Sequence, residues 1–192
     1  MDLTDLRSIF YKTKYLRTTL ELNENEVDIV IAADAGSILK IEGLAKEIWT
    51  EHYNGIVSKE QIEYMLSTLQ SAKAIEKQIE DGYMYYLVMD RSGKDLGYLA
   101  FLRKEEEFLL SKIYLRKECR RKGYGRQIVE FVLHVAKMNK AKKLTLFVNK
   151  KNSGSIEAYK KYGFTIAAAL VTDAGNGYIL DDFKMEKEII YA

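Results

Sequence analysis

The chain has 192 residues, and its 30 Lys and Arg against 28 Asp and Glu give a formal net charge of +2. This length predicts one domain with a sizeable core, while no apolar run reaches the length of a membrane span and the amino terminus lacks a signal-peptide pattern. The single cysteine, Cys119, excludes an internal disulfide and fits a reducing compartment. We therefore expect a cytoplasmic protein that does not enter a membrane.

The charge is divided unevenly along the chain. Residues 1–111 carry 13 Lys and Arg against 20 Asp and Glu, a net charge of −7, whereas residues 112–192 carry 17 against 8, a net charge of +9. A polyanion-binding protein is not expected to carry an opposing acidic half. The basic segments are also interrupted by structured apolar runs and lack a stacking-aromatic motif. Nucleic-acid binding is therefore the weakest function considered, and we expect none.

Hydrophobic periodicity predicts alternating helices and strands from residue 27 onward. Apolar residues at helical spacing predict five helices, and Ser58-x-x-Gln61 reads as a capping box at the start of the second. They are 37–50, 58–69, 72–80, 126–139 and 153–162. The fourth is apolar nearly all round and is expected to be buried, with His134 in the core. Alternating or continuous apolar runs predict strands at 27–31, 83–89, 96–102, 108–115, 144–148, 164–170 and 177–186.

The first 25 residues precede this pattern. Leu3, Leu6, Ile9 and Phe10 predict one or two amphipathic turns. We interpret residues 1–25 as an appendage of unknown role that packs either on the core or on the partner in a homodimer. Residues 26–192 are interpreted as the functional domain.

The most informative segment is Arg120-Arg121-Lys122-Gly123-Tyr124-Gly125, between the strand ending at Leu115 and the helix beginning at Arg126. Glycines let the backbone approach a ligand closely, and the free N–H groups of a helix's first turn attract anions. The segment lacks the Gly-Lys-Ser/Thr of a nucleoside-triphosphate loop and the third glycine of a dinucleotide fingerprint. We interpret it as a pyrophosphate site of another kind.

Its spacing, Arg-x-x-Gly-x-Gly after a strand, resembles the acetyl-coenzyme A loop of the GNAT superfamily of N-acetyltransferases. A second segment, Leu146 to Asn152 followed by Ile156, Tyr159 and Tyr162-Gly163-Phe164, resembles the family's strand, asparagine, helix, tyrosine and terminal Gly-Phe in the same order. Further stretches resemble a bacterial group akin to polyamine (spermidine/spermine) acetyltransferases. They are Glu51-His52-Tyr53, Tyr64-Met65-Leu66, residues 110–114, residues 173–178 and residues 181–186.

The resemblance implies an α/β (α+β) fold with a GNAT-like mixed, largely antiparallel sheet flanked by helices. In it, the strand before Arg116 lies parallel to the strand ending near Val148 and splays away from it, leaving edge amides for the pantetheine arm and one N–H for the thioester oxygen. The implied cosubstrate is acetyl-CoA, with no metal. The implied cofactor-binding residues are Leu115, Arg120, Arg121, Lys122, Gly123, Tyr124, Gly125, Arg126 and Asn152, the last as a positioning or helix-capping residue.

The resemblance also makes Tyr159 the candidate catalytic acid. A phenol of pKa near 10 can protonate a thiolate whose conjugate acid has a pKa near 8.5. The alternative is that Tyr159 is one of 14 tyrosines and merely packs at a helix interface. The general base stays open among Glu51, His52, Tyr53, Glu105, Glu106, Glu107 and Tyr114.

For the acceptor, the resemblance and the acidic first part of the chain favour a cationic small-molecule amine such as a polyamine. Candidate acceptor-binding residues are Glu51, His52, Tyr53 and Asp182, and alternation along a strand places Asp181 and Asp182 on opposite faces. The predicted function is acetyl transfer to a primary amine by direct attack in a ternary complex. The alternatives are a non-catalytic acyl-coenzyme A sensor or interaction protein, and a peptide or protein acetyltransferase.

Overall fold

The computed structural model describes residues 26–191, which form one seven-stranded sheet in the order β1-β2-β3-β4-β5-β7-β6. The predicted appendage, residues 1–25, lies outside the described residues. The strands are β1 (Asp28–Ile31), β2 (Tyr83–Met89), β3 (Asp95–Lys104), β4 (Glu107–Leu115), β5 (Lys143–Asn149), β6 (Thr165–Gly175) and β7 (Tyr178–Glu188). The helices are α2 (Ala35–His52), α3 (Lys59–Leu69), α4 (Ala72–Glu80), α5 (Tyr124–Met138) and α6 (Ser153–Lys161), with a short 3-10 turn, η1 (Lys117–Cys119).

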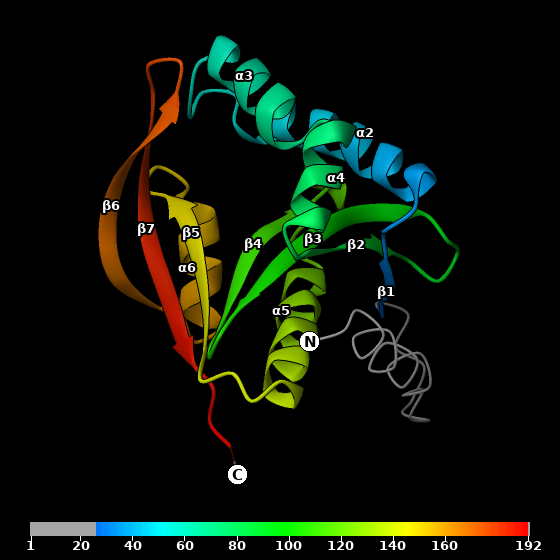
Figure 1. The fold of residues 1–192 in the computed structure, drawn as a ribbon, viewed down its shortest axis with the longest axis vertical. Coiled ribbons are helices and arrows are strands. Elements are labelled where there is room, and N and C mark those ends of the chain that lie inside the picture. The colour runs from blue at the N-terminus through cyan, green and yellow to red at the C-terminus, as the bar shows by residue number, and fades with distance from the viewer. Residues whose placement is uncertain (1–25, 192) are drawn as a thin grey trace.

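Helices cover both faces of the sheet and create two hydrophobic cores (Figure 1). Alternate residues of the central strands point to opposite faces, as the twofold repeat of a strand requires. Tyr85 and Tyr98 join the core under α2, α3 and α4, while Tyr86 and Leu99 join the core under α5 and α6. The predicted mixed, largely antiparallel sheet flanked by helices is confirmed.

The parallel pair β4 and β5 sets the shape of the molecule. The two strands are in register only from Glu107 opposite Lys143 to Leu109 opposite Thr145. Beyond this point β4 continues against β3 to Leu115, and β5 continues against β7 to Asn149. Figure 1 shows the two strands diverging in this part. The predicted splay of the parallel pair is therefore present.

Three details differ from the sequence predictions. Helix α5 begins at Tyr124, two residues early, because Gly123 has φ +88° and serves as its N-cap. Strand β6 extends to Gly175, since an Asn176-Gly177 turn with both φ values positive lets it continue against β7 as a hairpin. His134 is exposed on α5 rather than buried in the core, because the apolar face of α5 is narrower than its sequence suggests.

The β6–β7 hairpin bends over to α3. The rings of Tyr64 and Tyr178 lie 5.3 Å apart, and Gln61 Nε2 donates to the carbonyl oxygen of Ile179 at 3.5 Å. These contacts join the two halves of the sheet through the helical layer above them. Within residues 26–191, the helices are all too short or too polar to cross a membrane.

Candidate functional site

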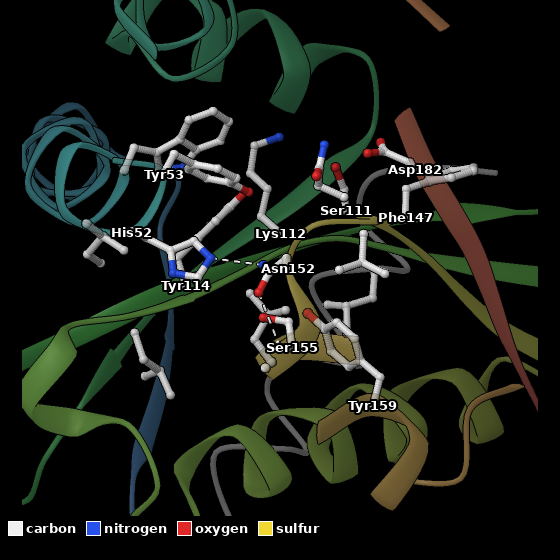
Figure 2. Close-up of a pocket in the computed structure, with 18 of the residues that line it drawn as sticks. His52, Tyr53, Ser111, Lys112, Tyr114, Phe147, Asn152, Ser155, Tyr159 and Asp182 are labelled. Carbon is white, nitrogen blue, oxygen red and sulfur yellow. Dashed lines mark hydrogen bonds between the residues drawn. The ribbon is translucent and has the colours of Figure 1, made fainter. Parts of the chain in front are cut away.

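A cavity of about 850 Å³ occupies the space where β4 and β5 diverge. Its walls come from the C-terminal end of α2, from α3, β4 and β5, from the loop before α5, from α6 and from the β6–β7 hairpin. Figure 2 shows side chains from these elements converging on it. Chain segments more than 100 residues apart thus build a single site.

At one end of the cavity, the loop before α5 presents backbone donors that no acceptor within residues 26–191 pairs. Arg121 has φ +62° and Gly123 has φ +88°, and the N–H groups of Arg126 and Gln127 both bond to the Gly123 carbonyl oxygen. The preceding N–H groups, those of Tyr124 and Gly125, lie in the first turn, where a helix offers no carbonyl partner. The loop and the positive end of the helix dipole therefore have the geometry and charge that suit an anion.

The cationic side chains around this loop differ in their partners. Arg120 donates from Nε to the Leu115 carbonyl oxygen at 3.0 Å and from Nη2 to Glu51 at 2.6 Å, so its guanidinium ties β4 to α2. Arg126 pairs with Glu130 at 2.8 Å. In the part of the chain that the structure describes, Arg121 and Lys122 are exposed and make no ion pair. These two are the cations left for a bound anion.

The other predicted cofactor residues fall in two groups. Leu115, Arg120, Arg121, Gly123, Gly125 and Asn152 line the cavity, whereas Lys122, Tyr124 and Arg126 do not. Tyr124 is buried beneath the loop and Arg126 faces outward along α5. The loop therefore contributes to the cavity mainly through its backbone.

Glu51, predicted to bind the acceptor, does not line the cavity and has partners of its own. It contacts Arg120 and lies 3.6 Å from Lys117. Burial alone would raise the pKa of Glu51, but the hydrogen bond and charge of Arg120, with Lys117, hold that pKa below its usual value. Glu51 is thus an ionised carboxylate neutralised by two cations, and its role is to fix the loop to α2.

Asn152 connects the cofactor side of the cavity to α2. Its Oδ1 accepts from the Ser155 N–H at 3.3 Å, which makes it the N-cap of α6 as the sequence predicts. Its Nδ2 lies 2.9 Å from His52 Nε2, and because the amide oxygen is already an acceptor, Nδ2 donates and Nε2 accepts. Burial, and then the charge of Arg120, lower the pKa of His52. The imidazole is therefore neutral with its Nε2 lone pair engaged.

Three tyrosine hydroxyls face the middle of the cavity. Those of Tyr53 and Tyr114 lie 3.3 Å apart, and the Trp49 ring packs on both. The Tyr159 ring meets Phe164 edge-on, and Figure 2 shows its hydroxyl pointing into the cavity. Burial raises the pKa of all three phenols, so each keeps its proton throughout the physiological range.

Asp182 lies across the cavity from these tyrosines, on β7. Its neighbour Asp181 points to the other face and pairs with Lys150, as strand alternation predicts. Burial, and next the charge of Asp181, raise the pKa of Asp182. Asp182 is thus the predicted acceptor-binding acid that does line the cavity.

Several cavity residues are not among the predicted site residues, and Lys112 is one of them. Lys112 is buried in the wall formed by β4, at 7% exposure. Its neighbours in the sequence are those of an ordinary strand, and no local pattern marks it as buried. Among residues 26–191, no group of three or more His, Cys, Asp or Glu side chains is placed to hold a metal ion.

Comparison with known proteins gives consistent results. Residues 53–188 match the family model described as an acetyltransferase (GNAT) domain. An uncharacterized N-acetyltransferase of Methanocaldococcus jannaschii is 28% identical over 99 residues, which are 48% of this chain and 42% of that protein. The matched part is thus about two fifths of the length of this curated relative.

Two solved structures show the same fold. The PaiA N-acetyltransferase from Thermoplasma acidophilum, in complex with coenzyme A, is 21% identical with a TM-score of 0.72 over 85% of this chain and 99% of that chain. The spermidine N-acetyltransferase from Vibrio cholerae, in complex with CoA and spermine, is 16% identical with a TM-score of 0.63 over 85% and 95%. At these identities the likeness concerns the fold.

Burial and the charge of Arg120 predict a pKa for His52 below the usual histidine value, measurable by NMR titration of the ring protons, with a His134→Gln variant to assign the two histidines. Asn152→Asp keeps an N-cap acceptor but replaces the amide donor with a carboxylate, so it should raise the His52 pKa above the wild-type value. Equal pKa values in the wild type and Asn152→Asp would show that the contact does not form in solution.

Proposed function

The chain belongs to the GNAT acetyltransferase family, and on that premise we propose that it transfers an acetyl group from acetyl-coenzyme A to a primary amine. The transfer is direct, within a ternary complex of enzyme, acetyl-coenzyme A and acceptor. The observation that carries this proposal is the cavity itself, which unites an anion-binding loop, a diverging strand edge and a tyrosine hydroxyl.

Each part has a chemical use. The N–H groups of Tyr124 and Gly125, with Arg121 and Lys122 nearby, suit the pyrophosphate of coenzyme A. The edge of β4 that β5 leaves after Leu109 supplies backbone groups for the pantetheine arm and an N–H donor for the oxyanion that develops on the thioester. Backbone donors are held in place by the sheet, so they need no reorganisation during the reaction.

Tyr159 is the proposed general acid. When the neutral amine attacks the thioester carbon, a C–N bond forms, the C–S bond breaks and the electron pair of that bond leaves with sulfur, while the nitrogen loses its extra proton to water. A phenol that burial keeps protonated can donate its proton to this thiolate, or stabilise it by a hydrogen bond. Within residues 26–191, no hydrogen bond occupies the Tyr159 hydroxyl, which leaves it available to the sulfur.

A small primary amine suits the remainder of the cavity, next to Asp182. The narrower hypothesis of a polyamine rests on the sequence resemblance and on the acidic first part of the chain. Of the two acids that motivated it, Glu51 is neutralised by Arg120 and Lys117, and Asp182 alone faces the cavity. A cytoplasmic location, where acetyl-coenzyme A is available, belongs to the same proposal.

Turnover of acetyl-coenzyme A with a panel of amines, followed by the released thiol, tests the activity. We expect amine-dependent thiol release with equal amounts of acetylated amine. Tight binding of acetyl-coenzyme A with no thiol release for any amine class would instead favour the non-catalytic sensor.

Tyr159→Phe should lower kcat on the order of a hundredfold because the general acid is lost, with coenzyme A affinity unchanged. Tyr178→Phe is the matched control, since Tyr178 packs on Tyr64 outside the cavity lining. Steady-state kinetics and calorimetry measure the two effects. Full turnover by Tyr159→Phe at saturating substrates would make Tyr159 a packing residue.

Gly125→Ala should weaken coenzyme A binding by about tenfold, because a methyl group in the first turn of α5 stands where the pyrophosphate must approach. Among residues 26–191, a Cβ at this position would meet only the end of the Tyr162 side chain, with the hydroxyl at 3.2 Å, so the fold should survive. Gly43→Ala, in open space on α2, is the control. Unchanged affinity in a folded Gly125→Ala protein would place the pyrophosphate elsewhere.

A further inference from the structure

Lys112 is a buried cation without an acidic partner. Its Nζ lies 2.7 Å from Gln78 Oε1 and sits over the rings of Tyr83 and Tyr85, 5.5 and 5.3 Å from their centroids. Over residues 26–191, no carboxylate forms an ion pair with it. Burial lowers the pKa of Lys112 to about 8, so the ammonium is still the major form at neutral pH. A buried charge that lacks a counter-charge is costly and calls for a partner.

A β-bulge in β4 turns Lys112 toward the cavity. Leu110 lies opposite Phe101 and Lys112 opposite Ala100, so Ser111 is an extra residue in the ladder. In a regular strand Leu110 and Lys112 would share a face. With the bulge, Leu110 packs in the core under α5, while Lys112 projects to the face covered by α2, α3 and α4.

The ammonium has donors to spare. Of its three N–H groups, one is used by Gln78 Oε1, which also accepts from the Tyr85 hydroxyl at 2.8 Å. Gln78 is itself fixed, since its Nε2 donates to the Leu69 carbonyl oxygen at 3.0 Å. Among residues 26–191, no oxygen accepts from the other two N–H groups, which adjoin only the Tyr83 and Tyr85 rings, so a ligand oxygen could accept from them. Figure 2 shows Lys112 in the part of the cavity away from Tyr159.

The cavity lining also includes apolar side chains from the elements around Lys112, with Asp182 as the one carboxylate of the lining among residues 26–191. The apolar residues include Ile62 and Met65 of α3, Leu180 of β7 and the Trp49 ring. A single cation with two free donors matches one carboxylate, which accepts two hydrogen bonds. A polyamine would instead bring further positive charge against a buried ammonium, which is unfavourable.

We infer that the acceptor is an amine that also carries a carboxylate on an apolar body, as an amino acid does, and that Lys112 binds this carboxylate. The inference rests on the proposed acetyltransferase function and names its substrate class. In this arrangement the carboxylate is held at Lys112 and the amine reaches toward Tyr159, where the thioester would lie. Lys112 is thus a residue that determines acceptor specificity.

A measurement of carboxylate binding tests the inference without requiring any turnover. The probes are phenylacetate and its neutral isostere phenylacetamide, titrated by calorimetry into the protein–coenzyme A complex. The wild type should bind phenylacetate about tenfold more tightly, as expected for hydrogen bonds to a charged group. Lys112→Met, which keeps the length of the side chain, should abolish this preference and leave coenzyme A affinity unchanged.

Two further variants separate binding from general effects of charge or folding. Gln78→Glu keeps Lys112 but places a carboxylate beside its ammonium, so it should also remove the preference for phenylacetate. Lys73→Met removes an exposed charge from α4 and should leave the preference intact. Equal binding of the two probes by the wild type, or a preference that survives Lys112→Met, would overturn the inference.

The second measurement is the rate of acetylation of L-phenylalanine, compared with the rates for 2-phenylethylamine and spermidine. Lys112→Met should raise KM for L-phenylalanine at least tenfold while leaving that for 2-phenylethylamine within about twofold. Faster acetylation of spermidine or 2-phenylethylamine than of L-phenylalanine by the wild type would contradict the inference. If no amine is acetylated but phenylacetate binding depends on Lys112, the proposed function fails and the carboxylate site stands.

Discussion

The divergence of β4 and β5 is the constraint on which the rest of the structure depends. Parallel strands satisfy each other's backbone groups, so separating them after Leu109 and Thr145 leaves an edge that no other strand of residues 26–191 pairs. The separation persists because each strand has a second neighbour, β3 for β4 and β7 for β5. The two helical layers then close the gap from above and below. A cavity lined by backbone groups and accessible to a ligand results.

The loop and the helix N-caps that border this cavity are predictable from the sequence because their signals are local, whereas the divergence of β4 and β5 is expected only from the family resemblance. A glycine at φ +88° before an apolar helix, or an asparagine at an N-cap, is dictated by the backbone at that position and can be recognised from a few residues. The ends of strands depend on a second segment of the chain as well. Strand β6 extends beyond its run of apolar residues because its pairing with β7 continues up to the hairpin turn. Strand pairing depends on two segments, so the sequence of one segment does not determine where it ends.

The side-chain contacts within the site could not be predicted in this way. Asn152 meets His52 across 100 residues of chain, and Arg120 meets Glu51 across 69. The spacing of residues within one segment does not indicate which residue of the other segment it contacts. Residues that the sequence predicts for separate roles are therefore found as pairs that hold each other in place. Arg120 and Glu51 were assigned to cofactor and acceptor respectively, yet each neutralises the other. The motifs do identify the loop before α5, because its backbone conformation depends less on contacts with distant residues.

The acceptor site shows why formal charge along the chain is a poor guide to the potential inside a cavity. The acidic first part of the sequence favours a cationic ligand, but exposed acids are screened by solvent and Glu51 is paired. Lys112 belongs to the basic part, and a one-residue bulge in β4 carries it into a wall where little solvent screens its charge. In the acceptor site that we propose, this buried ammonium contributes more to the selection of a ligand than the surface carboxylates of the first part of the chain. The charge that selects the ligand would then depend on the bulge in β4 rather than on the composition of half the chain.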